Sequence, residues 1–306
     1  MKPKIVIILG PTAVGKSALA LELAGQLNGE IVNADSLQVY RFMDIGTGKP
    51  TLAERERVRH HLIDVVKPDQ EFNAAMFRHL ASEVIYQIHE RKRNPMVCGG
   101  TGLYLKALTR GLFAGPAQDV VFRSELEKEI AQSGLDSVYR RLAEIDPTVT
   151  STIHPNDRSR TVRALEVYQL TGKPISQWQN EHRFPEDSFD VLKVGLNLDR
   201  AELYERINRR SAAMIQAGLL DEVRSLVARG YSLDLKPLGS VGYAQMGKVI
   251  RGALTIDAAL AEIQQQTRHL AKRQLTWFRG DKDVRWFLPK QISEIFEIVQ
   301  EFLANY

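Results

Sequence analysis

The chain has 306 residues and carries 41 lysines and arginines against 37 aspartates and glutamates, for a formal net charge of +4. With 44% apolar and 25% charged residues, the composition is typical of a globular protein and excludes disordered, collagenous and coiled-coil chains. The single cysteine, Cys98, excludes a disulfide scaffold and a cysteine-rich zinc site, and suits a reducing cytoplasm.

The first 110 residues alternate apolar runs with helical patterns. Residues 5–9 predict a buried strand and not a signal peptide, because the run is short and a glycine loop follows it. Leu19, Leu23 and Leu27 have helical spacing. The further predicted elements are strands at 30–34 and 96–98 and helices at 16–27, at 77–91 and from about 102. This alternation predicts an α/β fold: a P-loop NTPase-like parallel sheet flanked by helices.

The pattern changes near residues 111–118, and no strand is predicted from there to about residue 185. The predicted helices of this stretch span 123–132, 135–145 and 158–170. A strand then returns at 190–198, followed by helices at 200–216, 219–229 and 256–278. We therefore expect a core formed by residues 1–114 and 187–306, with an inserted all-helical subdomain at 115–186. No apolar run approaches the roughly 18 residues of a membrane span, so we expect no membrane contact.

A phosphate-binding loop is predicted between the first strand and the first helix. It has the pattern G-x-x-x-x-G-K-[ST] and reads Gly10-Pro11-Thr12-Ala13-Val14-Gly15-Lys16-Ser17. Its backbone N–H groups and the start of the helix favour a phosphate chain, Lys16 supplies a cation, and the Ser17 hydroxyl is a candidate Mg²⁺ ligand. The loop alone does not choose between a nucleotide-binding enzyme, such as an ATP-binding kinase or a GTPase, and an enzyme that holds another diphosphate.

Two further sites of polar residues follow predicted strands. Asp35 ends the second strand, where it serves as a general base, a metal ligand or the cap of a turn. Thr101 lies within a glycine cluster, Gly99-Gly100-Thr101-Gly102, either as a site hydroxyl or as a helix cap. Asp64 ends an apolar run and is a weaker candidate for a Walker-B metal ligand.

The predicted C-terminal helix has a basic face. Arg268, Lys272 and Arg279 project within about 40° of one another at 100° per residue. The other face carries the apolar residues Ile263, Thr267, Leu270, Trp277 and Phe278, which we expect to be buried. The basic ridge suits a phosphate backbone, or it is an ordinary solvated surface.

These stretches, in this order, resemble the tRNA dimethylallyltransferase (tRNA isopentenyltransferase) family over nearly the whole chain. Besides the loop, the N-terminal stretches are Asp35-Ser36-Leu37-Gln38-Val39-Tyr40, Met43-Asp44-Ile45-Gly46-Thr47-Gly48-Lys49-Pro50, His60-His61-Leu62-Ile63-Asp64 and Gly99–Tyr104. The C-terminal stretches are Asn156-Asp157-Arg158-Ser159-Arg160-Thr161-Val162-Arg163-Ala164-Leu165-Glu166, Val241-Gly242-Tyr243, Ala271-Lys272-Arg273-Gln274 and Trp277-Phe278-Arg279. Val14 and Leu37 depart from the usual residues at positions without a polar role.

The resemblance implies transfer of a dimethylallyl group from dimethylallyl diphosphate to N6 of adenosine 37 in tRNA. Residues 10–17 would hold the donor's diphosphate as a leaving group. Lys16, Arg210 and a Mg²⁺ ion at Ser17 would stabilise its charge, with Arg209 and Arg224 as rivals of Arg210. Asp35 would be the general base and Thr101 would hydrogen-bond near the reacting centre.

The resemblance also implies contacts with the tRNA anticodon loop, from which the target base must be extruded. The residues carried over from the family are Asp35, Ser36, Leu37, Gln38, Thr101, Arg123, Ser159, Arg160, Thr161, Val162 and Arg163. The arginines of the inserted subdomain alternatively form salt bridges with Glu125, Glu127 and Glu166. We expect a cytoplasmic monomer.

Two alternatives stay open at this stage. A small-molecule P-loop kinase shares the loop, although the basic stretches exceed what a small acceptor needs. A non-catalytic RNA-binding module would use the loop as a nucleotide switch, although Asp35 and Thr101 at strand ends argue against it.

Overall fold

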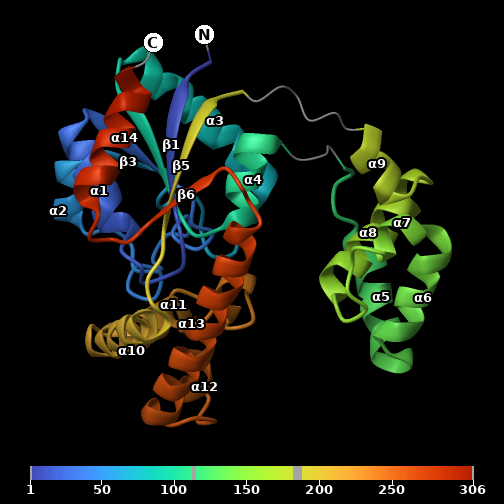
Figure 1. The fold of residues 1–306 in the computed structure, drawn as a ribbon. Coiled ribbons are helices and arrows are strands. Elements are labelled where there is room, and N and C mark those ends of the chain that lie inside the picture. The colour runs from blue at the N-terminus through green and yellow to red at the C-terminus, as the bar shows by residue number, and fades with distance from the viewer. Residues whose placement is uncertain (1, 112–114, 182–187, 305–306) are drawn as a thin grey trace. The chain divides into compact units, whose positions relative to one another are not determined.

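The computed structural model describes residues 2–111, 115–181 and 188–304 and divides the chain into two compact units. One unit consists of residues 1–110 and 187–306, and the other of residues 111–186. Figure 1 shows a sheet flanked by helices in the first and helices alone in the second. No helix in the described part of the chain has the length and apolarity that a membrane span requires.

A six-stranded parallel sheet forms the centre of the larger unit, in the order β3-β2-β4-β1-β5-β6. The strands are β1 (Lys4–Leu9), β2 (Gly29–Asn33), β3 (His60–His61), β4 (Asn94–Cys98), β5 (Asp190–Leu196) and β6 (Val284–Phe287). The central strand β1 is buried along its whole length, which explains its continuous apolar run. The predicted P-loop-like α/β fold is confirmed.

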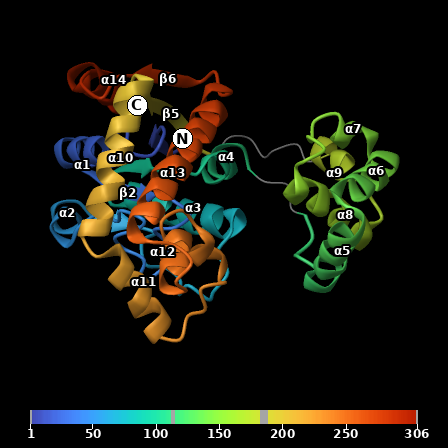
Figure 2. The same ribbon diagram turned by 90° about the horizontal axis from the view of Figure 1, so that it is seen from below.

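Helices cover both faces of this sheet (Figures 1 and 2). They are α1 (Lys16–Gln26), α2 (Leu52–Arg57), α3 (Ala74–Glu90), α4 (Gly102–Arg110), α10 (Arg200–Gln216), α11 (Leu219–Ala228), α12 (Tyr243–Ile250), α13 (Ile256–Arg279) and α14 (Ile292–Ala304), with a 3₁₀ turn at Lys236–Gly239. Val6 and Ile8 share a core with α1, α10 and α14. Ile7 and Leu9, on the opposite face, lie beside α4 and the end of α13.

The smaller unit is helical throughout its described residues. Its helices are α5 (Val120–Ser133), α6 (Leu135–Ile145), α7 (Pro147–Thr150), α8 (Arg158–Thr171) and α9 (Ile175–Glu181). A core of its own is built around Leu126, Val138, Leu142 and Leu165. The unit therefore has the separate hydrophobic core that an independently packed insertion requires.

Several element boundaries differ from the sequence predictions, and side-chain caps explain two of them. Helix α3 begins at Ala74, three residues early, because the Asn73 side chain accepts hydrogen bonds from the N–H groups of Ala75 and Met76. Helix α5 begins at Val120 because Asp119 caps it through the N–H of Phe122. The strand predicted to reach residue 198 ends at Leu196.

Candidate active site

The phosphate loop lies where β1 ends and α1 begins, as predicted. Gly10 has φ +144°, and a Cβ there would lie 2.5 Å from the carbonyl oxygen of Leu196, so only glycine fits. Gly15, at φ +110°, is the N-terminal cap of α1 and leaves the first N–H groups of the helix without a side-chain partner. An anion at this point would meet these N–H groups and the positive end of the helix.

Two cations stand beside the loop. The ammonium group of Lys16 donates a 2.7 Å hydrogen bond to the carbonyl oxygen of Pro11. Burial lowers the pKa of Lys16 to about 8; Cys98 and Asp35 oppose this shift, and the charge of Arg210 adds to it. Arg210, from α10, lies 3.4 Å from the Thr12 hydroxyl, and burial lowers its pKa while Asp35 raises it. A diphosphate would relieve the repulsion between these two cations.

Asp35 follows β2 and faces the same region. Its Oδ1 accepts hydrogen bonds from the N–H groups of Leu37 at 2.8 Å and Gln38 at 3.4 Å, so one oxygen caps the turn. The structure gives Oδ2 no hydrogen bond from any described residue. One carboxylate therefore has both a structural oxygen and an oxygen that is available to take a proton.

Thr101 and the glycines around it join three segments at the ends of the strands. The Thr101 hydroxyl accepts a 3.0 Å hydrogen bond from the N–H of Ser36, which ties the segment after β4 to the one after β2. A Cβ on Gly99 would lie 2.2 Å from the carbonyl oxygen of Ala34, and one on Gly100 would lie 2.4 Å from Nε2 of Gln274. The glycine cluster thus serves close packing, while the Thr101 hydroxyl hydrogen stays available for a substrate.

Gln274 also belongs to the site, although the sequence predicted no role for it beyond its place in the motif Ala271-Lys272-Arg273-Gln274. Its Oε1 accepts from the N–H of Thr12 at 2.8 Å, and its Nε2 donates to the carbonyl oxygen of Gly100 at 2.9 Å. Helix α13 is thereby fastened to the phosphate loop and to the glycine cluster at once. The only sequence signal for this role is the position of Gln274 within the quoted motif.

Two neighbouring cavities have these groups in their walls. A cavity of about 110 Å³ is lined by Lys16, Ser17, Gln38 and Cys98. A cavity of about 520 Å³ is lined by Ser36, Leu37, Thr101 and Arg273. Both are lined by Thr12, Asp35, Thr47, Gly100, Arg210, Leu270 and Gln274. The smaller space at the phosphate loop and the larger one beside it therefore share Asp35 and Arg210 as wall residues.

Several candidates lie outside this region. Asp64 forms salt bridges with Lys49 at 2.6 Å and Arg55 at 2.9 Å and lines neither cavity, so the structure gives no support to the interpretation of Asp64 as a Walker-B ligand. Among the described residues, no three His, Cys, Asp or Glu side chains form a group that could hold a metal. Of the rivals of Arg210, Arg209 is exposed and near Glu205, and Arg224 is exposed and paired with Asp221.

The predicted basic ridge of α13 is only partly present. Arg268 is not a free cation, because it donates to Asn208 at 2.8 Å and lies over the ring of Tyr204. Trp277, expected to be buried, is 43% exposed. A Cβ on Gly102 would lie 2.3 Å from Trp277 Nε1, so the indole covers the start of α4 with one edge and leaves the rest open.

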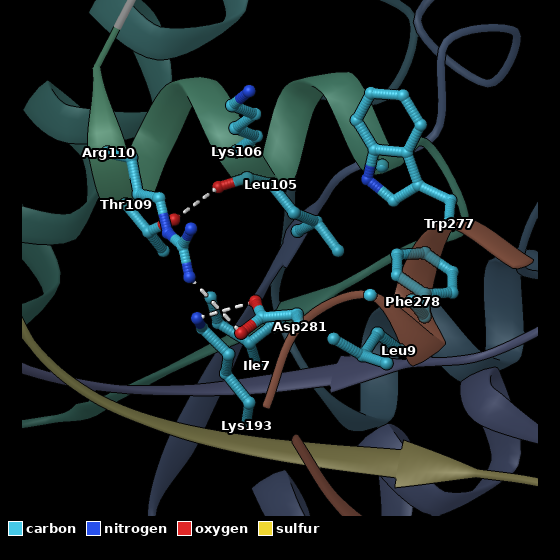
Figure 3. Close-up of a pocket in the computed structure, with 12 residues that line it drawn as sticks. Ile7, Leu9, Leu105, Lys106, Thr109, Arg110, Lys193, Trp277, Phe278 and Asp281 are labelled. Carbon is cyan, nitrogen blue, oxygen red and sulfur yellow. Dashed lines mark hydrogen bonds and ion pairs between the residues drawn. The ribbon is translucent and has the colours of Figure 1, made fainter. Parts of the chain in front are cut away.

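A separate pocket of about 200 Å³ lies beyond Trp277, between the sheet and α4 (Figure 3). Lys193 and Arg110 both point toward Asp281 there, at 2.8 and 3.3 Å. These ion pairs join β5 and the end of α4 to the segment after α13. None of the predicted site residues lines this pocket.

Comparison with known proteins identifies the family of this chain. A family model described as IPP transferase matches residues 38–281. A tRNA dimethylallyltransferase of Syntrophobacter fumaroxidans is 52% identical over 92% of this chain and 83% of its own length, and one of Geobacter metallireducens is 49% identical over 98% of each. The chain belongs to the tRNA dimethylallyltransferase family.

Solved structures agree with this assignment. The full-length tRNA isopentenylpyrophosphate transferase of Bacillus halodurans is 40% identical, with a TM-score of 0.73 over 99% of this chain and 97% of its own. A eukaryotic dimethylallyltransferase, described as acting on tRNA, is 28% identical, with a TM-score of 0.81 over 99% of this chain and 80% of its own. The resemblance that the motifs indicated is confirmed.

In this member of the tRNA dimethylallyltransferase family, two candidate tRNA residues of the helical unit, Arg123 and Arg163, bind Glu166. The buried carboxylate of Glu166 accepts two hydrogen bonds from Arg123, at 2.6 Å to Oε1 and 2.8 Å to Oε2, and Arg163 also donates to Oε2. Burial alone would raise the pKa of Glu166, but hydrogen bonds from Arg123 and Arg163 and from the N–H of Asp119 outweigh it and lower the pKa.

The remaining candidates of this unit divide by exposure. The side chains of Thr161 and Val162 are buried, so they face the core of the unit and not a partner. Ser159 and Arg160 are exposed in the first turn of α8. Among the candidate residues of α8, Ser159 and Arg160 are therefore the ones whose side chains are open to solvent.

Proposed function

We propose that the protein transfers the dimethylallyl group of dimethylallyl diphosphate to N6 of adenosine 37 in tRNA. The observation that carries this proposal is the pair of neighbouring cavities that both have Asp35 and Arg210 in their walls. One is suited to a diphosphate and the other, at about 520 Å³, is large enough for an extruded base. A donor and an acceptor entering from the two sides would meet beside a carboxylate.

The phosphate loop would bind the leaving group and not a nucleotide's phosphates. Cleavage of the allylic C–O bond builds negative charge on the diphosphate, and the loop N–H groups, Lys16 and Arg210 are placed to stabilise it. The hydrogen bond between Arg210 and Thr12 keeps that guanidinium against the loop. Because the pKa of Lys16 is lowered to about 8, binding of the diphosphate would be coupled to protonation of the Lys16 amine.

The residues at the loop fit a Mg²⁺ ion that is held jointly with the substrate. Magnesium in such sites takes few protein ligands and several phosphate oxygens, and Ser17, exposed in the first turn of α1, offers a hydroxyl of this kind. When bound, the ion would neutralise part of the diphosphate's charge. Asp64 would not contribute, because Lys49 and Arg55 occupy its carboxylate.

Asp35 would act as the general base. The N6 amine is a weak nucleophile because its lone pair is delocalised into the ring, so it must lose a proton as the new C–N bond forms. The unoccupied Oδ2 of Asp35 would take this proton, while Oδ1 stays bonded to the turn and fixes the carboxylate. The Thr101 hydroxyl would form a hydrogen bond with the N6 amine or with the bridging oxygen of the donor.

We propose that the helical unit contacts the anticodon loop through Ser159, Arg160 and the arginines on Glu166. Segment 35–38 and Thr101 would receive the base in the core. We propose a cytoplasmic monomer that acts on tRNA. A small-molecule kinase is less well supported, because the relatives carry the transferase name.

The test is a transfer assay with purified protein, Mg²⁺, radiolabelled dimethylallyl diphosphate and unmodified tRNA, followed by digestion of the RNA to nucleosides. We expect label in a prenylated adenosine, and no ATP hydrolysis in a parallel reaction that contains ATP and tRNA. Turnover of ATP without labelled RNA would overturn the proposal in favour of a kinase. Bound tRNA with neither product would favour the non-catalytic switch.

A further inference from the structure

The last turns of α13 leave one large aromatic side chain open to solvent. Trp277 is 43% exposed, whereas Phe278, which follows it, is buried. A Cβ on Gly102 would lie 2.3 Å from Nε1 and 2.4 Å from Cδ1 of the indole, so one edge of the ring packs on the first turn of α4. This contact holds the ring in place, while the rest of the indole stays accessible to a partner.

This exposed ring lies next to the larger of the two cavities of the candidate active site. Gly102, on which the indole packs, directly follows Thr101, and Thr101 lines that cavity. Arg273 lines the same cavity from α13. Because Arg273 and Trp277 are four residues apart, their side chains project within about 40° of each other at 100° per residue. Trp277 is thus one helical turn away from the space that the proposed function assigns to the extruded adenosine.

The surroundings of Trp277 are basic. Residues 102–110 and 263–280 contain no aspartate or glutamate. Lys106 and Arg273 are exposed, and neither forms an ion pair with a described residue. Lys106 and Trp277 line the same pocket of about 200 Å³, and Figure 3 shows the ammonium group of Lys106 pointing away from the ion pairs of that pocket. An open aromatic ring with unpaired cations beside it suits single-stranded nucleic acid, whose bases stack on the ring and whose phosphates meet the cations.

We propose that Trp277 is a stacking platform for a nucleotide that flanks the extruded adenosine, with Arg273 and Lys106 at the neighbouring phosphates. Extrusion of a base leaves each of its neighbours without one stacking partner, and the indole would replace that partner. Stacking of this kind is independent of the identity of the base, because every base has a π face. This inference rests on the proposed function, since it names a further contact of that site with its RNA.

The experiment measures the affinity of an anticodon stem-loop RNA for Trp277→Leu and Trp277→Phe, with thermal unfolding of each variant. Trp277→Gln replaces Trp277→Leu if the latter is unfolded. Tyr86→Leu is the matched control, because Tyr86 is an aromatic residue of similar exposure, 45%, on α3 and lines neither cavity of the site. Two further RNAs lack the base on one or the other side of adenosine 37. The chain has three tryptophans, so a protein with Trp178→Phe and Trp286→Phe reports stacking through the fluorescence of Trp277 alone.

We expect Trp277→Leu to weaken RNA binding by about tenfold or more, the loss typical of one stacked base, while the Kd for inorganic diphosphate stays within about twofold. Trp277→Phe keeps an aromatic face and should stay within about threefold of wild type, and Tyr86→Leu should equal it. The RNA should quench the fluorescence of the single-tryptophan protein. One of the two abasic RNAs should bind wild type about as weakly as intact RNA binds Trp277→Leu, with no further loss when the two changes are combined.

Wild-type RNA affinity in a folded Trp277→Leu protein would overturn the inference. An equal loss from Trp277→Leu for the intact RNA and for both abasic RNAs would also overturn it, because the indole would then contact neither flanking base. The readout is binding and not turnover, so the two proposals fail separately. A protein that binds the RNA through Trp277 but transfers no prenyl group would contradict the proposed function while leaving the stacking platform intact.

Discussion

Replacing Asp35 with asparagine separates the two tasks that its carboxylate has in the structure. Asparagine keeps an Oδ1 that can accept from the N–H groups of Leu37 and Gln38, so the turn after β2 should persist. It cannot take a proton at Oδ2. Alanine at the same position removes both the turn cap and the base.

The expected magnitudes differ for the two tasks. General base catalysis contributes about 10²–10⁴ in rate, or about 2.7–5.4 kcal/mol in the activation free energy. A neutral hydrogen bond in the turn contributes about 1 kcal/mol to the free energy of unfolding. Asp35→Asn should therefore lower the rate of prenyl transfer at least a hundredfold with little change in stability. Asp35→Ala should lose about as much activity and also about 1 kcal/mol of stability.

The assay is single-turnover transfer from labelled dimethylallyl diphosphate to tRNA at saturating concentrations of both, with urea unfolding of each variant in parallel. A rate for Asp35→Asn within tenfold of wild type would refute the base assignment. A large loss in Asp35→Ala alone would show that the carboxylate matters only as the cap of the turn.

Three further predictions follow from groups near the site and in the helical unit. The pKa of Lys16 is about 8, and in the proposed mechanism its charged form binds the diphosphate. The KM for dimethylallyl diphosphate should therefore rise above pH 8, by up to about tenfold per pH unit. Lys16→Arg should flatten this pH profile. Asp64→Asn should leave the Mg²⁺ dependence of transfer unchanged and cost about 1 kcal/mol in urea unfolding, whereas a lost Mg²⁺ response would restore the Walker-B interpretation. Glu166→Gln should destabilise the helical unit by about 1–3 kcal/mol, because it replaces the buried carboxylate that accepts from Arg123 and Arg163 with a neutral amide. Since the pKa of Glu166 is below its ordinary 4.5, this stabilisation is present above pH 4.5 and should be lost as the pH falls further, and equal unfolding free energies of wild type and variant at pH 7 would contradict it.

The parts of the site that lie on consecutive residues could be predicted from the sequence. The phosphate loop has a fixed spacing between a strand and a helix, and Asp35 and Thr101 directly follow strands whose ends meet in a parallel sheet. Their places in the structure follow from this topology. Arg210 needed the family resemblance, because nothing local distinguishes it from Arg209 beside it.

Contacts between distant segments could not be predicted in the same way. Gln274 reaches Thr12 across more than 260 residues, and Glu222, on α11, accepts hydrogen bonds from the backbone N–H groups of residues 44–46. Neither pairing has a periodic signal. Trp277 illustrates the opposite error: its position on the apolar face of α13 predicted burial, but the ring packs only one edge on Gly102 at the start of α4 and is 43% exposed.

Some local structure was missed although the sequence contained a signal for it. Helix α14 buries Ile295 and Val299, four residues apart, which is ordinary helical spacing. Strand β3 has only two residues and is too short to show any alternation. In the helical unit, the alternative of salt bridges is confirmed at Glu127 and Glu166, but the sequence did not show that Glu166 would be buried.

The central claim is that the two cavities bring a donor diphosphate and the N6 amine of adenosine 37 together at Asp35. The most direct measurement uses two anticodon stem-loop RNAs that differ only in having adenosine or inosine at position 37, incubated with labelled dimethylallyl diphosphate and Mg²⁺. The account predicts one prenyl group per adenosine RNA, equimolar release of diphosphate, and no label in the inosine RNA, which lacks the amine. Label in the inosine RNA, or diphosphate release without labelled adenosine, would contradict it.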